Sequence, residues 1–250
     1  MTRPLFVQGL SKRFGGLVAT RDVNLELALG QVHAVIGPNG AGKTTLISLL
    51  SGLLPADAGT VEFFGQPLHG LSQQERVRAG LVRSFQITSI FSGLSVLENL
   101  QVSVQRRLHR DAGLFASARA DRRARDQAAA VASRVGLSLN LDAPAMTLSH
   151  GMRRRLDLGL ALACEPHMLL MDEPMAGMGH DEAHEMVALI RSLTPALTVL
   201  LVEHDMDAVF SLADRISVLV QGAIIATGSV QEIRDNQEVR VAYLGEEEAV

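Results

Sequence analysis

The chain of 250 residues is 47% hydrophobic and carries a formal net charge of −4, which together predict one α/β domain with a substantial core and argue against a nucleic-acid-binding surface. Its single cysteine, Cys164, excludes an internal disulfide framework and favours a reducing compartment. The longest apolar runs are strand-sized, well short of the ~20 residues that span a bilayer, so we expect any work at a membrane to depend on partners.

The N-terminal part of the chain has the pattern of short strands around one helix. Turn residues separate the apolar runs: Gly15-Gly16 lies between the first two, and the third runs into a glycine-rich loop. The segment after this loop has helical periodicity and ends near Pro55. We predict strands at Leu5–Leu10, Val23–Leu27, Gln31–Ile36 and Thr60–Phe64, and a helix at Thr44–Leu53.

Three later runs are largely apolar and are bounded by breaker residues. They are Leu81–Phe85, Met168–Met171 and Thr198–Val202. Such runs are typical of strands that are buried on both faces of a mostly parallel sheet. Near the C-terminus, Ile216–Val220 and Ala223–Thr227 predict a hairpin closed by a Gln-Gly turn.

The segment from about Leu94 to Ala163 has a different composition. It is rich in Ala, Arg, Leu and Gln and lacks β-branched runs, so we predict an all-helical insert. The charged stretch Arg119–Arg134 within it is typical of a solvated helix face. The outline is therefore an α/β sheet domain that is interrupted by a helical subdomain.

A glycine-rich segment between a predicted strand and a predicted helix fits the phosphate-binding pattern G-x-x-x-x-G-K-[ST]. Glycines let consecutive backbone N–H groups curl around phosphate oxygens, and the helix N-terminus adds its positive dipole end. Lys43 would supply a compact charge to the outer phosphates, and Thr44 would place its hydroxyl on Mg²⁺. The alternative, a chance glycine turn, is disfavoured by the complete pattern in this context. The predicted nucleotide-binding residues here are Gly37, Pro38, Asn39, Gly40, Ala41, Gly42, Lys43, Thr44 and Thr45.

The strand Met168–Met171 is followed by two carboxylates, Asp172 and Glu173. At the carboxyl end of a parallel strand they would point toward the crevice where such sheets bind ligands. Asp172 is suited to hold Mg²⁺ through water, and Glu173 to orient and activate an attacking water. Two solvated acids that close a strand are common on their own, but beside a phosphate loop they indicate a nucleotide enzyme.

A third motif narrows the choice among nucleotide enzymes. Leu148–Met152, with the sequence LSHGM, precedes three arginines at a predicted helix start, about twenty residues before the acidic strand. On its own, Ser149 would be an ordinary helix N-cap. In this order along the chain, the segment resembles the signature, usually LSGGQ, of the ATPase subunits of ABC transporters.

The resemblance implies roles for three further residues. Gln86 matches the glutamine that senses Mg²⁺ and contacts the membrane subunit, His204 matches the switch histidine at the γ-phosphate, and Phe14 matches the aromatic residue on which adenine stacks. Each has a plainer alternative: a surface polar residue for Gln86, a helix N-terminal residue for His204 and a core side chain for Phe14.

The resemblance covers essentially the whole chain and implies its fold. That fold is an α/β P-loop NTPase with a mostly parallel core sheet, an antiparallel β subdomain and an inserted helical subdomain. Within a single ABC ATPase domain, 1–250, residues 1–88 and 164–235 would form the nucleotide-binding core. Residues 89–163 would form the helical subdomain with the signature, and 236–250 a C-terminal tail.

The implied chemistry is Mg²⁺-dependent hydrolysis of ATP in a head-to-tail dimer. Each ATP would lie between the phosphate loop of one subunit and Ser149 and Gly151 of the other. The predicted catalytic residues are Lys43, Glu173 and His204, and the predicted Mg²⁺ residues are Thr44, Gln86 and Asp172.

Four local strings resemble the ATPases of branched-chain amino-acid importers and their urea and amide relatives: Arg13–Ala19, Val82–Gln86, Glu203–Met206 and Ala242–Gly245. They imply transmembrane permease subunits, a second ABC ATPase subunit and, through the complex, a solute-binding protein as partners. The family resemblance also implies a cytoplasmic position on the inner face of the cell membrane. We expect Ile87–Leu97, which follows Gln86 and alternates apolar with small polar residues, to contact the permease. The alternatives are an ATPase of a lipopolysaccharide-transport-type exporter, a soluble non-transport ABC ATPase, and a phosphate-loop kinase.

Two segments depart from the family pattern. His150 stands where glycine is usual and Met152 where glutamine is common, although Ser149 is retained. In the loop after the acidic strand, Gly179 takes the place of the usual Asp or Asn. We therefore expect communication between subunits to be weaker or differently arranged.

Overall fold

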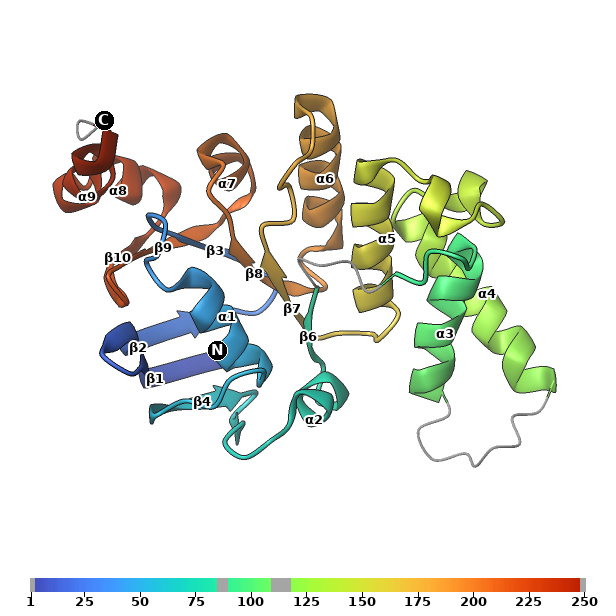
Figure 1. Ribbon diagram of the computed structural model, residues 1–250, viewed down its shortest axis with the longest axis horizontal. Helices are drawn as coiled ribbons and strands as arrows, with labels where there is room; N and C mark the ends of the chain where they lie inside the picture. The colour runs from blue at the N-terminus through green and yellow to red at the C-terminus, as the bar shows by residue number, and fades with distance from the viewer. Residues whose placement is uncertain (1–2, 85–89, 109–117, 248–250) are drawn as a thin grey trace.

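Two sheets form the centre of the computed structural model, which describes residues 3–84, 90–108 and 118–247 (Figure 1). In these ranges the larger sheet has the strand order β10-β9-β3-β8-β7-β6, and all but β10 run parallel. The smaller sheet is antiparallel, in the order β2-β1-β4-β5. The predicted mostly parallel core sheet and antiparallel β subdomain are confirmed. The strands are Leu5–Phe14 (β1), Leu17–Leu27 (β2), Val32–Ile36 (β3), Ala58–Phe63 (β4), Gln66–Pro67 (β5), Leu81–Arg83 (β6), Met168–Asp172 (β7), Thr198–Val202 (β8), Arg215–Val220 (β9) and Ala223–Gly228 (β10).

The apolar composition of the parallel strands explains why they lie in the core. All residues of β3, β7 and β8 are buried, because helices or the second sheet cover both of their faces. The predicted hairpin of β9 and β10 is confirmed. The predicted strand at Leu81–Phe85 is shorter than expected: β6 ends at Arg83, and Phe85 lies outside the described residues.

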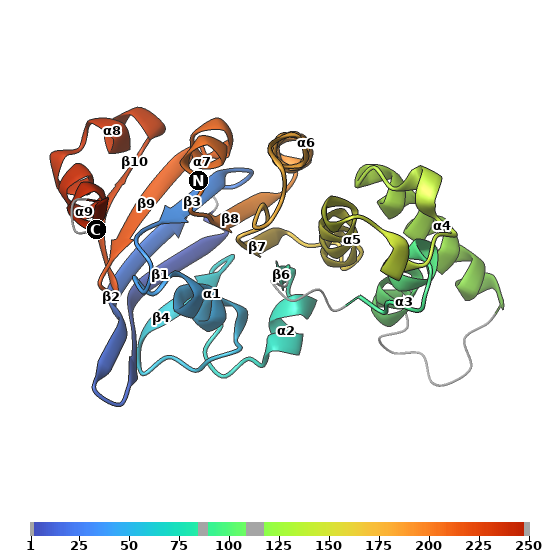
Figure 2. The same ribbon diagram turned by 45° about the horizontal axis from the view of Figure 1, so that its top comes forward.

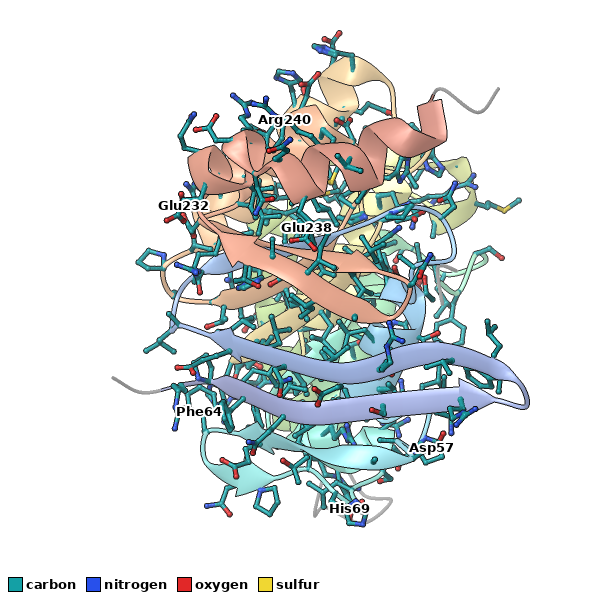
Figure 3. All side chains as sticks on the ribbon, turned by 90° about the vertical axis from the view of Figure 1, so that its left-hand side faces the viewer. Asp57, Phe64, His69, Glu232, Glu238 and Arg240 are labelled. Atoms are coloured by element: carbon teal, nitrogen blue, oxygen red, sulfur yellow. The ribbon has the colours of Figure 1, made fainter. Side chains whose placement is uncertain are left out.

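The large sheet lies between two layers (Figure 2). Helix α1 (Lys43–Ser51) and the antiparallel sheet cover one face, where Val35 packs with Leu46 and Leu200. Helices on the other face include α6 (His180–Leu193), whose Ile190 packs on this sheet. Figure 3 shows α9 lying over β10, with the β1–β2 hairpin on the opposite side of that strand. The other helices of the α/β part are α2 (Gln73–Arg78), α7 (Met206–Leu212), α8 (Val230–Asp235) and α9 (Gln237–Glu247).

The predicted helical insert is confirmed over its described part. Its helices are α3 (Val96–Leu108), α4 (Ala118–Arg134) and α5 (His150–Leu162), with short 3-10 turns at Ser138–Asn140 and Ala145–Thr147. They pack together at one end of the molecule (Figure 1), around a core that includes Leu100, Ala128 and Leu156. In the ranges that the structure describes, no helix has the length and apolar content to cross a membrane.

Candidate functional site

The loop between β3 and α1 is shaped by glycine. Gly42, the residue before α1, has a φ of +106°, and a Cβ atom there would overlap the carbonyl oxygen of Ala19. Glycine is therefore required at this position. Because α1 starts at Lys43, its first N–H groups, which have no partner within the helix, open toward the loop. This arrangement favours binding of an anion such as a phosphate.

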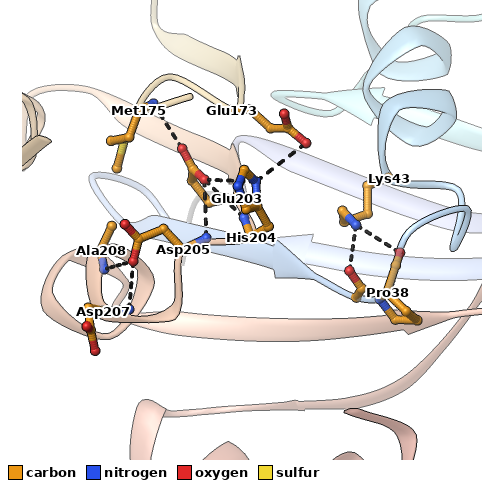
Figure 4. A network of polar contacts seen from close by, with 10 residues as sticks. Pro38, Lys43, Glu173, Met175, Glu203, His204, Asp205, Asp207 and Ala208 are labelled. Atoms are coloured by element: carbon orange, nitrogen blue, oxygen red, sulfur yellow. Dashed lines mark hydrogen bonds and ion pairs between the residues drawn. The ribbon is translucent and has the colours of Figure 1, made fainter. Parts of the chain in front are cut away.

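The Lys43 side chain folds back across the loop (Figure 4). Its Nζ donates hydrogen bonds to the carbonyl oxygens of Gly37 (2.5 Å) and Pro38 (2.9 Å). The side chain is buried. The cation is thus held beside the backbone N–H groups, where it adds to the positive potential of the loop.

A cavity of about 360 Å³ opens over this loop. Residues 39–45 line one side, Phe14 and Val18 of the β1–β2 hairpin line another, and Glu173 borders the same space. Phe14 is 45% exposed, which excludes the alternative that it is a core side chain. An exposed aromatic ring on one side and a cationic loop on the other match the base and the phosphates of a nucleotide.

Asp172 lies at the end of β7 and is almost completely buried. Its Oδ2 accepts a hydrogen bond from Nη2 of Arg83 at 2.9 Å, and Nη1 of Arg83 donates to Ser48 at 3.1 Å. Burial raises the pKa of Asp172 above its usual value; the negative charge of Glu173 adds to this rise, and Arg83 opposes it.

The second oxygen of Asp172, Oδ1, is buried and has no hydrogen-bond partner among the described residues. Mg²⁺ prefers oxygen ligands and keeps several of its waters. A carboxylate with one unpartnered oxygen, next to a phosphate-binding loop that begins its helix with Lys43-Thr44, fits a Mg²⁺ ion that is held through water.

Glu173 and His204 come together from neighbouring strand ends (Figure 4). Glu173 has a φ of +50°, a left-handed conformation that is uncommon for a residue other than glycine and is often found at functional sites. Nδ1 of His204, after β8, lies 3.8 Å from Oε1 of Glu173, a distance that gives an ion pair when the imidazole is protonated. The structure thus brings two of the predicted catalytic residues, Glu173 and His204, close together.

The structure does not bring the signature residues to this cavity. Ser149 caps α5, where its hydroxyl accepts a hydrogen bond from the Met152 N–H at 3.2 Å, and Gly151 lies in the first turn of that helix. Neither lines the cavity beside Lys43. Gln86 lies outside the described residues, so its predicted roles stay predictions.

Sequence reasoning missed two polar residues of the site, Arg83 and Glu203. Each is a charged residue within or directly after an otherwise apolar strand, and that position was the available signal. Glu203 is completely buried, and its carboxylate accepts hydrogen bonds from the N–H groups of Met175 (2.9 Å) and His204 (3.0 Å).

Comparisons with known proteins identify the family and the fold of the chain. A family model described as "ABC transporter" matches residues 20–176, and one described as "Branched-chain amino acid ATP-binding cassette transporter" matches residues 223–249. The high-affinity branched-chain amino acid transport ATP-binding proteins BraF of Pseudomonas aeruginosa and LivG of Escherichia coli are each 41% identical to the chain. Both alignments cover 98% of this chain and 100% of the relative.

Two solved structures have the same fold. The first is the ADP conformation of MJ1267, an ATP-binding cassette of an ABC transporter, with a TM-score of 0.86 and 29% identity over 98% of this chain and 100% of that one. The second is a nucleotide-free ATP-binding cassette from an ABC transporter, with a TM-score of 0.83 and 30% identity over 96% of this chain and 98% of that one.

Proposed function

Because the chain belongs to the ABC transporter family, as one of its ATP-hydrolysing subunits, we propose that it drives the import of branched-chain amino acids. The printed function of BraF and LivG, whose sequences align with nearly the whole chain, supports this substrate class. The match of residues 223–249 to a family model that carries the same substrate name supports it independently.

The proposed mechanism, in which ATP joins two subunits, rests on one observation: the predicted ATP-binding residues of one chain lie in two separate places. The phosphate loop, Glu173 and Phe14 border one cavity, whereas Ser149 and Gly151 lie outside it on α5. A second subunit in head-to-tail orientation would present its own Ser149 and Gly151 to the γ-phosphate. The ATP would then bridge two subunits, and its hydrolysis would release them.

In this proposal the chain's own residues carry out hydrolysis by positioning and by charge. The loop N–H groups and Lys43 hold the β- and γ-phosphates, Glu173 orients the attacking water and accepts its proton, and His204 keeps the closed geometry at the γ-phosphate. Mg²⁺, held through Asp172 and Thr44, would neutralise the charge that develops on the phosphate oxygens.

A second cavity, of about 200 Å³, supports the predicted contact with a permease. It lies between the large sheet and the helical insert and is lined by residues that include Val82, Phe91, Asn99 and Cys164. Phe91, in the described part of the predicted contact segment 87–97, is 57% exposed. We propose that a cytoplasmic segment of a permease docks here, which would hold the chain on the inner face of the membrane.

The test is isolation of the native complex from detergent-solubilised membranes. We expect two permease-like membrane proteins, a second ABC ATPase and a solute-binding protein to copurify. A Phe91→Glu variant tests the proposed docking cavity. This variant should no longer copurify with the permeases, but the isolated chain should retain its ATPase activity. Recovery of soluble partners alone would contradict the assignment to transport and leave the ATPase chemistry in place.

A further inference from the structure

His150, the unusual residue of the signature, contacts the loop that follows the catalytic strand. Its Nε2 lies 3.1 Å from the carbonyl oxygen of Ala176, and because a carbonyl only accepts, the ring must donate from this nitrogen. The next residue, Gly177, has a φ of +75°, and a Cβ there would lie only 3.3 Å from His150 Nε2. The glycine therefore leaves room for the imidazole beside the backbone of this loop.

The other side of the same loop is held by Glu203 (Figure 4). One oxygen of its buried carboxylate accepts the N–H of Met175 at 2.9 Å. The other accepts the N–H groups of His204 (3.0 Å) and Asp205 (3.4 Å). A buried carboxylate that bonds to three backbone donors fixes the loop after β7 relative to the loop after β8.

Residues 175–178, which make both contacts, form a short segment that is bonded through its own backbone. The Ala176 N–H donates to the Glu173 carbonyl at 3.1 Å, and the Met178 N–H donates to the Met175 carbonyl at 3.1 Å. Because Ala176 is bonded to the Glu173 carbonyl, a displacement of the signature would be transmitted through this segment to the predicted catalytic glutamate.

We propose that His150 and Glu203 are positioning residues that couple the two ATP sites of the dimer through residues 175–178. In the proposed head-to-tail dimer, the signature of one chain meets the ATP that is bound to its partner, whereas Glu173 and His204 act on the ATP of their own chain. A shift of the signature would move Ala176 through its contact with His150. A shift of Met175 would move His204 through their shared contact with the Glu203 carboxylate. The inference rests on the proposed function, because it requires two ATP sites in a dimer.

The experiment separates closure of the dimer from turnover. ATP-driven dimerisation is measured by light scattering in the Glu173→Gln background, and kcat is measured on chains that retain Glu173. We expect His150→Ala to lower kcat by at least about 5-fold, the lower end of coupling factors between sites, while ATP still drives dimerisation to the same extent. His150→Gln, whose amide retains an N–H donor, should restore most of kcat.

Three further variants complete the test: His180→Ala, Glu203→Gln and the His150→Ala/Glu203→Gln double variant. His180→Ala removes another exposed histidine, just beyond the same loop, and should leave kcat unchanged. In the His150→Ala/Glu203→Gln double variant, the losses in kcat should not multiply, because both substitutions interrupt one connection. His150 is exposed, so its variants should keep the thermal midpoint of the parent chain.

The outcomes are distinct. If His150→Ala weakens dimerisation and kcat in parallel, His150 acts only at the phosphate and the inference is wrong. It is equally wrong if kcat does not change, or if the double variant shows fully multiplied losses. If the Glu173→Gln chain does not dimerise with ATP at all, the proposed function itself fails and the inference fails with it.

Discussion

The large sheet buries polar side chains in two regions and stabilises them in different ways. At the carboxyl ends of β7 and β8, Asp172 and Glu203 are buried carboxylates that directly precede Glu173 and His204. In the interior of β3, His33 is also completely buried, but its Nε2 is hydrogen-bonded to the hydroxyl of Ser217 at 2.8 Å. Ser217 in turn bonds to Thr227 at 2.7 Å, so this chain of neutral groups runs across three strands.

The two regions differ in the charge of their buried side chains. Burial, with a smaller contribution from the charge of Arg215, lowers the pKa of His33 to about 4, so the ring is neutral at pH 7, although its Nδ1 is also buried without a hydrogen-bond partner among the described residues. Asp172 keeps one buried oxygen without a partner among the described residues, which costs stability in the absence of a ligand. The interior of β3 therefore holds a neutral ring, whereas the ends of β7 and β8 retain carboxylates at the predicted catalytic site.

The largest effect should come from removing the cation of the catalytic region. Lys43→Ala should lower kcat/KM for ATP by about 10²- to 10³-fold, the range for loss of one preorganised electrostatic contact. A coupled ATPase assay measures this effect. Arg3→Ala is the control, because Arg3 makes an exposed ion pair with Glu26, away from the cavity, and contributes little. Normal turnover by the Lys43 variant would contradict the assignment of the phosphate loop.

The buried histidine of β3, His33, should make the stability of the protein depend on pH. Below pH 6.5 the unfolded chain binds a proton at His33, but the folded chain does not bind it until about pH 4. The free energy of unfolding should therefore fall as the pH is lowered through this window, by about 3 kcal/mol in total from this residue. Urea titrations at pH 7, 6 and 5 measure the slope. His33→Gln should flatten it, and identical slopes for parent and variant would show that His33 is protonated when folded.

The smallest effect should come from Phe14. Because its ring is exposed, its removal should affect nucleotide binding and leave the packing of the core unchanged. Phe14→Ala should weaken ATP binding by about tenfold, the effect of losing roughly 1–2 kcal/mol of base stacking, and leave the thermal midpoint unchanged. Equilibrium binding of a fluorescent ATP analogue measures the affinity. Phe14→Tyr keeps the ring and should bind like the parent chain. Unchanged affinity in Phe14→Ala would mean that adenine lies elsewhere.

The features that could be predicted from sequence are those with a local pattern. The glycine loop before Lys43 and the carboxylates after β7 are strand-end motifs, and the apolar runs of β7 and β8 could be recognised within a residue at each end. Two unpredicted helices, α2 and α8, also carry a local signal: Ser72 and Ser229 each form a capping box with a glutamate three residues later.

The features that could not be predicted depend on contacts between distant segments. Glu203 bonds to Met175, 28 residues earlier, and Arg83 bonds to Asp172, 89 residues later. A single sequence contains no periodicity that pairs such positions. His150 appeared only as a departure from the family pattern, because its partner is a backbone carbonyl that any residue could supply. The domain boundaries and the role of Gln86 stay predictions.

In the proposed function the two sheets would hold different ends of the nucleotide, since Phe14 belongs to the antiparallel hairpin and the phosphate loop follows a strand of the parallel sheet. A stacked ring holds the face of a base and does not contact the hydrogen-bonding groups on its edge, and the neighbouring wall is apolar at Leu17, Val18 and Ala19. We therefore expect GTP and ITP to be hydrolysed at rates similar to that of ATP. Transport would then draw on the whole purine triphosphate pool of the cell, so its energy supply would be buffered against a fall in ATP alone.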